Sequence, residues 1–324
     1  MVTKGQPGVG SAERQSASSP MRVLIAIDGS AASDATIDLA EKLAWPAGST
    51  IEVLEVTHPA PVYATGPWPT SVPIETERII AEARKSARTT VEEAVRRLQG
   101  PDRTIESTVL DGRAATVILD RAATLPADLI IIGSRGHGTL GSMLVGSVSS
   151  EVIDHASVPV LVAHSNQAER IVLAADGSDA VERVAELLTA WPIFGDATVR
   201  VVSVAHADPP WWTGFRPSPT GRAAEQVTPE PSIDHHKRLA HDMAARLADA
   251  GYAVEPKVRQ GDAASEIVAE ARDWDADLVM MGTRGRGGVP RLLLGSTARN
   301  VLHNVGCSVL VAHAAGARGE AGPA

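Results

Sequence analysis

Two glycine patterns have the residue types and spacing of a phosphate-binding turn. The first reads Gly133-Ser134-Arg135-Gly136, then nine residues, then Gly146-Ser147. The second reads Gly282-Thr283-Arg284-Gly285, then nine residues, then Gly295-Ser296. Each pattern follows an apolar, strand-like run and leads into a helix-like segment. A turn of this kind gathers backbone N–H groups at the positive end of a helix, which suits an anion such as phosphate. The sequence therefore predicts two nucleotide sites.

The two patterns belong to a long internal repeat. Residues 127–164 align without a gap on residues 276–313, and 16 of these 38 positions are identical. Residues 22–30 match residues 170–178 in the same way. Solenoid repeats run roughly 20–50 residues, so this longer period indicates duplicated domains. We predict a disordered leader over 1–20, domains over 21–165 and 169–314 joined by a short linker, and a flexible tail over 315–324.

Strand-like and helix-like segments alternate in each half, which predicts an α/β fold with a doubly wound parallel sheet. The strands are apolar in runs, as burial on both faces requires. Gly112 and Gly261 are interpreted as turn residues. In the first half we expect strands at 22–27, 50–56, 104–110, 128–132 and 158–163. We expect helices from Ser30 or Ser33 to about Trp45, from the Pro-rich loop to about Leu98, at 114–123 and at 147–155.

Composition narrows the class of protein. The chain has 324 residues, of which 44% are hydrophobic and 21% charged, typical of a soluble globular protein. A net charge of -9 argues against nucleic acid or an anionic membrane as partner. No apolar run approaches the roughly 18 residues of a membrane helix, and the first residues lack the apolar core of a signal peptide. The single cysteine, Cys307, fits a reducing compartment, so we expect a cytoplasmic location.

Ligands of doubly wound sheets bind beyond the carboxyl ends of the strands. If the first and fourth strands are neighbours, the turn at Asp28 faces the loop at Gly133 across one crevice. Gly133 and Gly136 would let the backbone bend closely around phosphates, and Gly146 with Ser147 would offer N–H groups and a hydroxyl. Asp28 would accept a hydrogen bond from a ribose or base, hold a magnesium ion bridging phosphates, or simply cap its turn. The second half repeats this set with Asp176, Gly282, Gly285, Gly295 and Ser296.

Catalytic machinery is not readable in these patterns. No Gly-Lys-Ser/Thr follows the glycines, and no lysine lies between Lys85 and Lys237, so this is not a Walker P-loop. Charge on a transferring phosphoryl group would have to be met by Arg135, Arg284 or a metal, which favours holding a nucleotide over fast hydrolysis. The equivalent pairs His58 and His206, and His164 and His313, lack the close ligand spacing of a zinc site. Trp211-Trp212 is either a partner-binding patch or a pair that folds back onto its domain.

The glycine pattern, the Asp that ends the first strand and the final apolar strands (158–162 and 309–311) resemble the universal stress protein family. From about Arg22 to His313 the chain is similar to a tandem pair of such domains. The resemblance implies a Rossmann-like fold, similar to adenine nucleotide alpha hydrolases, with a five-stranded parallel sheet and flanking helices in each domain. Some family members bind ATP through this motif. The last strand often pairs two domains, which implies an internal pseudo-dimer here and further association into a homodimer.

The resemblance also implies site residues by position. Ala298 lacks the hydroxyl of Ser149, so we expect weaker binding at the second site. The first site would use Asp28, Val56, Gly133, Arg135, Gly136, Gly146, Ser147, Val148 and Ser149, and the second Asp176, Val204, Gly282, Arg284, Gly285, Gly295, Ser296, Thr297 and Ala298.

Three functions follow from these observations. The first is a stress-response or signalling module that binds ATP or AMP, one per domain, with or without magnesium. The second is a slow ATPase, or a protein that phosphorylates itself on Ser147, Ser149 or Ser296. The third is a nucleotide-free scaffold that acts through dimerisation. Because both glycine patterns are present, we rank the scaffold last and regard the chain as a binding protein rather than an enzyme.

Overall fold

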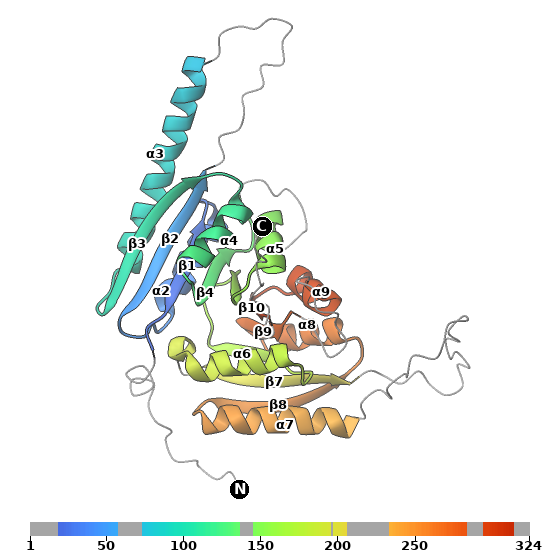
Figure 1. Cartoon of the computed structure of the whole chain (residues 1–324). Coiled ribbons are helices and arrows are strands. Elements are labelled where there is room, and N and C mark those ends of the chain that lie inside the picture. The colour runs from blue at the N-terminus through green and yellow to red at the C-terminus, as the bar shows by residue number, and fades with distance from the viewer. Residues whose placement is uncertain are drawn as a thin grey trace, which may run out of the picture.

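The computed structural model of the chain describes residues 19–57, 73–136, 145–195, 197–205, 233–283 and 294–313. These residues form one sheet of ten strands with helices on both faces (Figure 1). Nearly all of the predicted leader and all of the predicted tail lie outside the described residues. The same holds for most of the Pro-rich loops and for His58, His206 and Trp211-Trp212. The first half contains β1 (Arg22–Ile27), α2 (Ala31–Lys42), β2 (Ser49–Thr57), α3 (Pro73–Leu98), β3 (Arg103–Asp111), α4 (Ala114–Thr124), β4 (Leu129–Gly133), α5 (Ser147–His155) and β5 (Val160–Ala163).

The second half repeats this order. It contains β6 (Arg170–Ala174), α6 (Asp179–Ala190), the 3-10 turn η1 (Pro192–Phe194), β7 (Thr198–Ala205), α7 (Ile233–Asp249), β8 (Ala253–Gln260), α8 (Ala263–Asp273), β9 (Leu278–Gly282), α9 (Ser296–Asn304) and β10 (Ser308–Ala312).

The strand order joins the two halves through their last strands. It runs β3-β2-β1-β4-β5-β10-β9-β6-β7-β8, and each half is parallel within itself. β5 and β10 pair antiparallel, with Leu161 opposite Leu310. The predicted α/β fold of two tandem five-stranded domains is confirmed, and the halves pair internally as the resemblance implied. Because β5 and β10 run in opposite directions, the carboxyl ends of the two sets of strands lie at opposite edges of the sheet.

Two hydrophobic layers sandwich the sheet, which explains why the strands are apolar in runs. One layer lies under α2, α3, α6 and α7 and includes Ile25, Leu39 and Leu247. The other lies under α4, α5, α8 and α9 and includes Leu24 and Val301. Each layer is continuous across both halves, so burial stabilises the domain junction as well as each domain.

The helix bounds follow from local chemistry. Ser30 is the N-cap of α2 and accepts a hydrogen bond from the N–H of Ser33. The helix ends at Lys42, three residues before the predicted end at Trp45, because Leu43 has an extended backbone. The Trp45 indole N–H then donates to the Ala40 carbonyl at 2.8 Å and closes the end of the helix. Gly112 and Gly261 have φ of 147° and 148°, which confirms their role as turn residues.

A buried ion pair links strand to helix in each half, with its charges reversed. In the first half Glu52 of β2 accepts from Arg121 of α4 at 2.7 Å. In the second half Arg200 of β7 donates to Glu270 of α8 at 2.8 Å. The repeat aligns Glu52 with Arg200 and Arg121 with Glu270, so the same strand and helix positions carry opposite charges.

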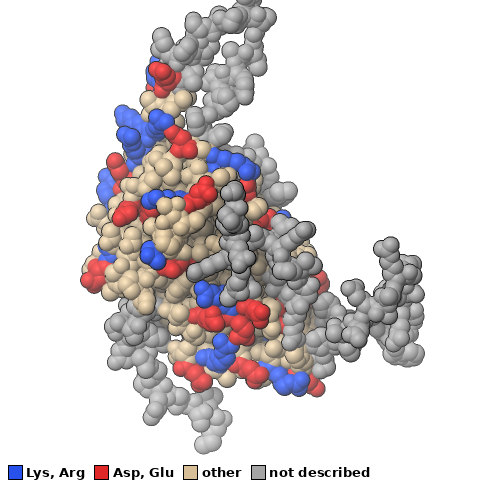
Figure 2. Space-filling model, viewed as in Figure 1, with Lys and Arg blue, Asp and Glu red and all other residues tan. Residues whose placement is uncertain are grey.

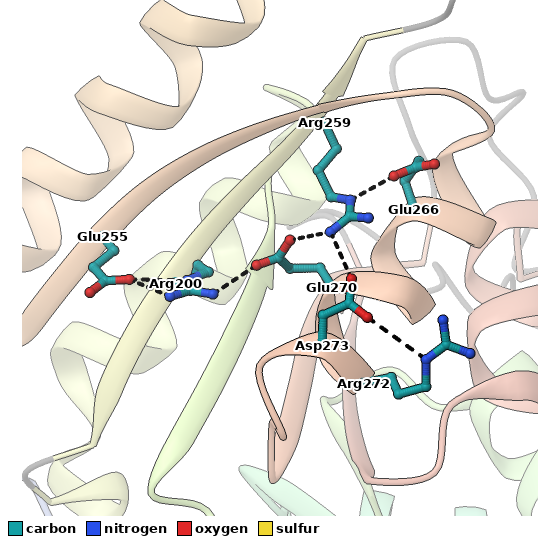
Figure 3. A network of polar contacts seen from close by, with 7 residues as sticks. All are labelled: Arg200, Glu255, Arg259, Glu266, Glu270, Arg272 and Asp273. Carbon is teal, nitrogen blue, oxygen red and sulfur yellow. Dashed lines mark hydrogen bonds and ion pairs between the residues drawn. The ribbon is translucent and has the colours of Figure 1, made fainter.

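The second pair belongs to a wider network (Figure 3). Glu270 also accepts from Arg259 at 2.5 Å, and the Arg200 guanidinium lies 4.3 Å from the ring centre of Trp274. Arg259 in turn donates to Glu266 at 2.6 Å. These carboxylates raise the pKa of Arg259 above its usual value. Each buried charge of this network is therefore paired, as burial in a low-dielectric interior requires.

Candidate functional site

A cavity of about 300 Å³ opens beyond the carboxyl ends of β1, β2 and β4. β1 lies between β2 and β4, so the condition that the first and fourth strands are neighbours is met. The cavity combines an apolar wall with a polar rim, and its volume falls within the range of small-ligand pockets. Its lining residues are Ala26, Ile27, Asp28, Ser33, Leu54, Val56, Ala114, Ile118, Ile132, Gly133, Arg135, Gly136, Gly146, Ser147, Val148 and Ser149.

Asp28 is held in place by the first turn of α2. Its Oδ1 accepts from the backbone N–H of Ser30 at 3.0 Å and from the hydroxyl of Ser33 at 2.7 Å. The Ser33 hydroxyl also accepts from the backbone N–H of Asp28 at 2.9 Å. The carboxylate therefore closes its own turn and at the same time lines the cavity. Its Oδ2 lies against Gly136, where an added Cβ would be 2.4 Å away.

The glycines of the first loop serve different purposes. A Cβ on Gly133 would meet the backbone of Ala32 at 3.1 Å, so this glycine permits close approach of α2 to the end of β4. At Gly146 a Cβ would meet Arg135 and Ser134 only at 3.6 Å, an ordinary contact. The N–H of Gly146 donates to the Ser134 carbonyl at 2.7 Å and fixes the start of α5 beside the loop. Space thus remains beside Gly146, whereas the packing of α2 requires glycine at 133 and the Asp28 carboxylate requires it at 136.

Ser147 and Ser149 have different surroundings although both lie in the first turn of α5. Ser147 is exposed at the helix N-terminus. Ser149 is 3% exposed, and its hydroxyl donates to the Gly133 carbonyl at 2.7 Å. This bond ties α5 to the end of β4. The Ser149 hydroxyl thus has a structural partner and is poorly placed to accept a phosphoryl group.

A histidine lies behind the loop. His164 Nδ1 is 3.1 Å from the hydroxyl of Ser134, the residue before Arg135. Burial lowers the pKa of His164, and the positive charge of Arg135 lowers it further. The neutral imidazole is therefore favoured in the folded protein.

The second half repeats this arrangement in part. Asp176 accepts from the backbone N–H of Ser178 at 2.9 Å, as Asp28 does from Ser30. The N–H of Gly295 donates to Thr283 O at 2.7 Å, the counterpart of the Gly146 bond. Gly295 is the N-cap of α9, followed by exposed Ser296 and half-buried Thr297. Arg284 and Gly285 lie outside the part of the chain that the structure describes.

The two halves differ at two hydroxyl positions. Val181 occupies the place of Ser33, so Asp176 has no hydroxyl partner from that position. Ala298 occupies the place of Ser149 and is 2% exposed, so the bond from α5 to β4 has no counterpart from this side chain. Gly282 is packed more tightly than Gly133, because a Cβ there would lie 2.5 Å from the Cβ of Ala180. Val204, like Val56, is half-buried near the carboxyl end of its strand.

Sequence reasoning considered Ser33 only as a helix cap and did not find the apolar wall of Leu54, Ile118 and Ile132. The signal for Ser33 is its spacing of five residues from Asp28 on the first turn of a helix. The sequence does not distinguish the wall residues from core residues, because an apolar residue near the end of a strand is expected to be buried in the core.

Among the described residues, no three His, Cys, Asp or Glu side chains gather as a metal site. No helix in the described ranges is long and apolar enough to cross a membrane. Lys and Arg intermingle with Asp and Glu over the face shown in Figure 2, without a broad region of one sign.

Comparison with known proteins gives consistent findings. The model of the universal stress protein family matches residues 20–164 and again 167–313. A universal stress protein of Mycolicibacterium smegmatis is 29% identical over 89% of this chain and 96% of its own length. One from Mycobacterium tuberculosis is 30% identical over 68% of this chain and 72% of its own length.

Solved structures agree with the fold. A universal stress protein from Archaeoglobus fulgidus superposes with a TM-score of 0.62, at 20% identity, over 90% of this chain and 98% of the other. A putative universal stress protein from Pseudomonas aeruginosa gives a TM-score of 0.55 at 15% identity, over 93% of this chain and 95% of the other.

Proposed function

The chain belongs to the universal stress protein family, and we propose that each of its two domains, residues 21–165 and 169–314, binds one adenine nucleotide as part of a stress-response or signalling function. The observation that carries the proposal is the cavity beside Asp28. It brings apolar side chains, a carboxylate and the N-terminus of α5 to one place. These three features match a nucleotide, which has a flat base, a polar ribose and an anionic tail.

The apolar wall supports the base end of the ligand. Leu54, Val56 and Ile118 line the cavity from β2 and α4 and offer a surface on which an aromatic base packs. Asp28 lies at the edge of this wall, already oriented by Ser33, and is placed to accept from an N–H or O–H of the base or ribose. A side chain fixed before binding loses little conformational entropy when the ligand arrives.

The loop and α5 support the phosphate end. Gly136 is exposed, and Ser147 begins a nine-residue helix whose first N–H groups lack intrahelical partners. The helix dipole adds a favourable potential for negative charge there. Arg135 is the one cationic side chain among the residues lining the described cavity. This supply of charge suits holding a nucleotide better than stabilising a phosphoryl-transfer transition state.

Magnesium would accompany the phosphates in this proposal. Asp28 is the one carboxylate among the residues lining the described cavity. Magnesium in nucleotide sites is commonly held by one or two carboxylates together with phosphates and water. Asp28 would hold the ion in place of its contact to the base or ribose, with phosphates and water as the other ligands.

The site residues of the second domain follow by the repeat. The turn at Asp176 and the N-cap Gly295 make the same backbone hydrogen bonds as their counterparts, which supports this extension, and Arg284 and Gly285 are carried over by position. Because Val181 and Ala298 replace two hydroxyls, we propose that the second domain binds the nucleotide more weakly than the first.

Nucleotide stoichiometry tests the proposal. The purified protein is saturated with ATP and magnesium, desalted and denatured, and the released nucleotide is quantified by chromatography; calorimetry gives the two affinities. We expect two nucleotides per chain, one in Gly146→Val, one in Gly295→Val and none in the double variant. Gly146→Val should keep its circular dichroism spectrum, since its Cβ would come no closer than 3.6 Å to Arg135 and Ser134, and its melting curve measures the cost of replacing the N-cap glycine of α5. Undiminished stoichiometry in both single variants would contradict the assignment of the sites.

A further inference from the structure

The two ends of the ten-stranded sheet differ in their capacity to accept another strand. β3 and β8 are the outermost strands of the described sheet. β8 carries Pro256 at its centre, opposite Val201 of β7. The repeat places Ser107 of β3 at this position, opposite Val53 of β2. Proline has no N–H, so within a sheet it lies where the N–H would point away from the neighbouring strand. The N–H of Ser107 therefore points outward, into an edge that no proline blocks.

The outward direction of the Ser107 N–H fixes the direction of the other backbone groups of β3. Successive residues of a strand direct their backbone N–H and C=O groups to opposite sides. Residues 103, 105, 107, 109 and 111 therefore direct theirs outward, whereas 104, 106, 108 and 110 bond to β2. β3 thus offers nine residues of regular outer edge. Proteins commonly protect such an edge with a proline, a bulge or an inward charge.

The sequence of β3 is complementary to itself when reversed. Pairing two copies antiparallel about Ser107 places Ile105 opposite Val109 and Arg103 opposite Asp111, each twice. Asp111 also pairs with Arg84 of its own chain, so its carboxylate would be shared between the two arginines. Opposite charges and β-branched residues in directly opposed positions are favourable cross-strand pairs. On the other face Leu110, which is 36% exposed, comes opposite Thr104. We propose that the outer edge of β3 is an interaction surface for a second copy of this chain.

The helix above β3 is compatible with this pairing. α3 packs on both β2 and β3, so its axis lies above the space between them. Across a β3–β3 junction the two α3 axes would be two strand spacings apart, about 10 Å, which is a normal helix–helix distance. Arg97 of α3 faces α2, where it contacts Glu41 at 3.2 Å. Arg88 lies nine residues earlier, about half a turn around the helix, and so faces the junction together with exposed Glu92.

The proposed interface closes on itself. β3 meets β3 around a two-fold axis, so each chain uses the surface once and no further copy is recruited. At the other end Pro256 and Lys257 protect β8 from the same pairing. The product is a dimer with one sheet of continuous strands rather than a fibre. It does not depend on nucleotide binding.

Cross-linking at the two-fold axis tests the register. In the proposed pairing two Ser107 residues form a hydrogen-bonded pair with Cα atoms about 5.5 Å apart, a separation that a disulfide spans. Under mild oxidation Ser107→Cys should convert most of the protein to a covalent dimer on a non-reducing gel. Lys257→Cys, on the exposed edge strand of the other half, should remain largely monomeric and controls for random collision. Equal cross-linking of both variants, or none at position 107, would overturn the proposal.

Mass measurement tests the association itself. Analytical ultracentrifugation of the full chain at tens of micromolar should give twice the monomer mass of 33.8 kDa. Ser107→Pro reproduces Pro256 of the other half, so it should keep the internal ladder and melting curve while reducing the mass to that of a monomer. A wild-type monomer at this concentration would refute the pairing. A dimer unchanged by Ser107→Pro would also refute it, because it would show an interface elsewhere.

Discussion

Exchanging the charges of Glu52 and Arg121 would test whether the acidic and the basic residue of this buried ion pair can swap places between the strand and the helix. The pair bridges β2 and α4 at 2.7 Å, and its counterpart in the other half is Arg200 with Glu270. We consider three variants, Glu52→Arg, Arg121→Glu and the double exchange. The double exchange reproduces in the first half the polarity that the second half already has.

The expected magnitudes follow from burial. Glu52 is fully buried and the Arg121 side chain is 31% exposed. Breaking a buried pair by removing one partner costs roughly 3–5 kcal/mol, and the partial exposure of Arg121 points to the lower end, about 3 kcal/mol for either single variant. In the double exchange the guanidinium at position 52 regains a carboxylate at 121. Glu106 occupies the position of Glu255, which contacts Arg200 in the other half. We therefore expect a coupling free energy of at least about 2 kcal/mol.

Thermal unfolding measures these effects. For a domain of this size about 1 kcal/mol shifts Tm by roughly 2–4 °C, so each single variant should melt about 6–12 °C lower. A coupling of about 2 kcal/mol or more means that the double exchange should melt at least about 4–8 °C higher than the summed losses of the two single variants predict. If the double variant is as unstable as the sum of the two single variants, the polarity is not interchangeable and the inference from the inverted pairs is wrong. Denaturant unfolding followed with a spectroscopic probe in the first domain would report unfolding of that domain separately from unfolding of the second domain.

Three further predictions concern the site and its surroundings. Ser149→Ala removes the bond that holds the start of α5 on the end of β4, and Ala298→Ser offers the same bond in the second half. If the whole of this bond, about 1 kcal/mol, acts on the position of the N–H groups of α5, the first site should bind nucleotide about fivefold more weakly and the second site more tightly; calorimetry of both variants decides this, and equal affinities throughout would contradict it. Burial, and then Arg135, lowers the pKa of His164, so its contribution to stability is complete above the unfolded-state pKa of about 6.5 and is lost as pH falls toward the folded-state pKa. His164→Asn should accordingly flatten the change of Tm between pH 7 and pH 5, and an unaltered slope would count against this reasoning. Burial raises the pKa of Cys307 to about 12, so a thiol reagent at pH 8 should label the denatured chain once and leave the native protein unmodified; rapid native labelling would disagree.

The sequence was sufficient for the fold because its signals are local and occur twice. Apolar runs gave the strands, and the repeat required both halves to share one topology. The placement of Asp28 opposite the loop at Gly133 followed from a single condition, that β1 and β4 are neighbours. That condition holds in the sheet.

Other features depend on contacts between distant residues and carry no local signal. The hydrogen bond from Ser33 to Asp28 depends on the geometry of the first turn of α2. The sequence alone therefore did not show that Val181, at the equivalent position, removes such a bond. In the sequence Gly133 is part of the predicted phosphate-binding loop. In the structure the packing of α2 on β4 excludes a side chain at this position. The reversed polarity of the buried pairs appears only when the strand and helix positions of both halves are superimposed.

The antiparallel contact between β5 and β10 also determines how the protein responds to dilution. In a dimer of separate domains this contact would form and dissociate with protein concentration. Here β5 ends at Ala163 and β6 begins at Arg170, so a short linker holds the two domains at an effective concentration in the millimolar range. The pair therefore persists at the low copy numbers of a cell. Every molecule contains one domain of each kind. If the two domains bind nucleotide with different affinities, as proposed above, the stronger and the weaker site stay in a one-to-one ratio, and one molecule would respond to two ranges of nucleotide concentration.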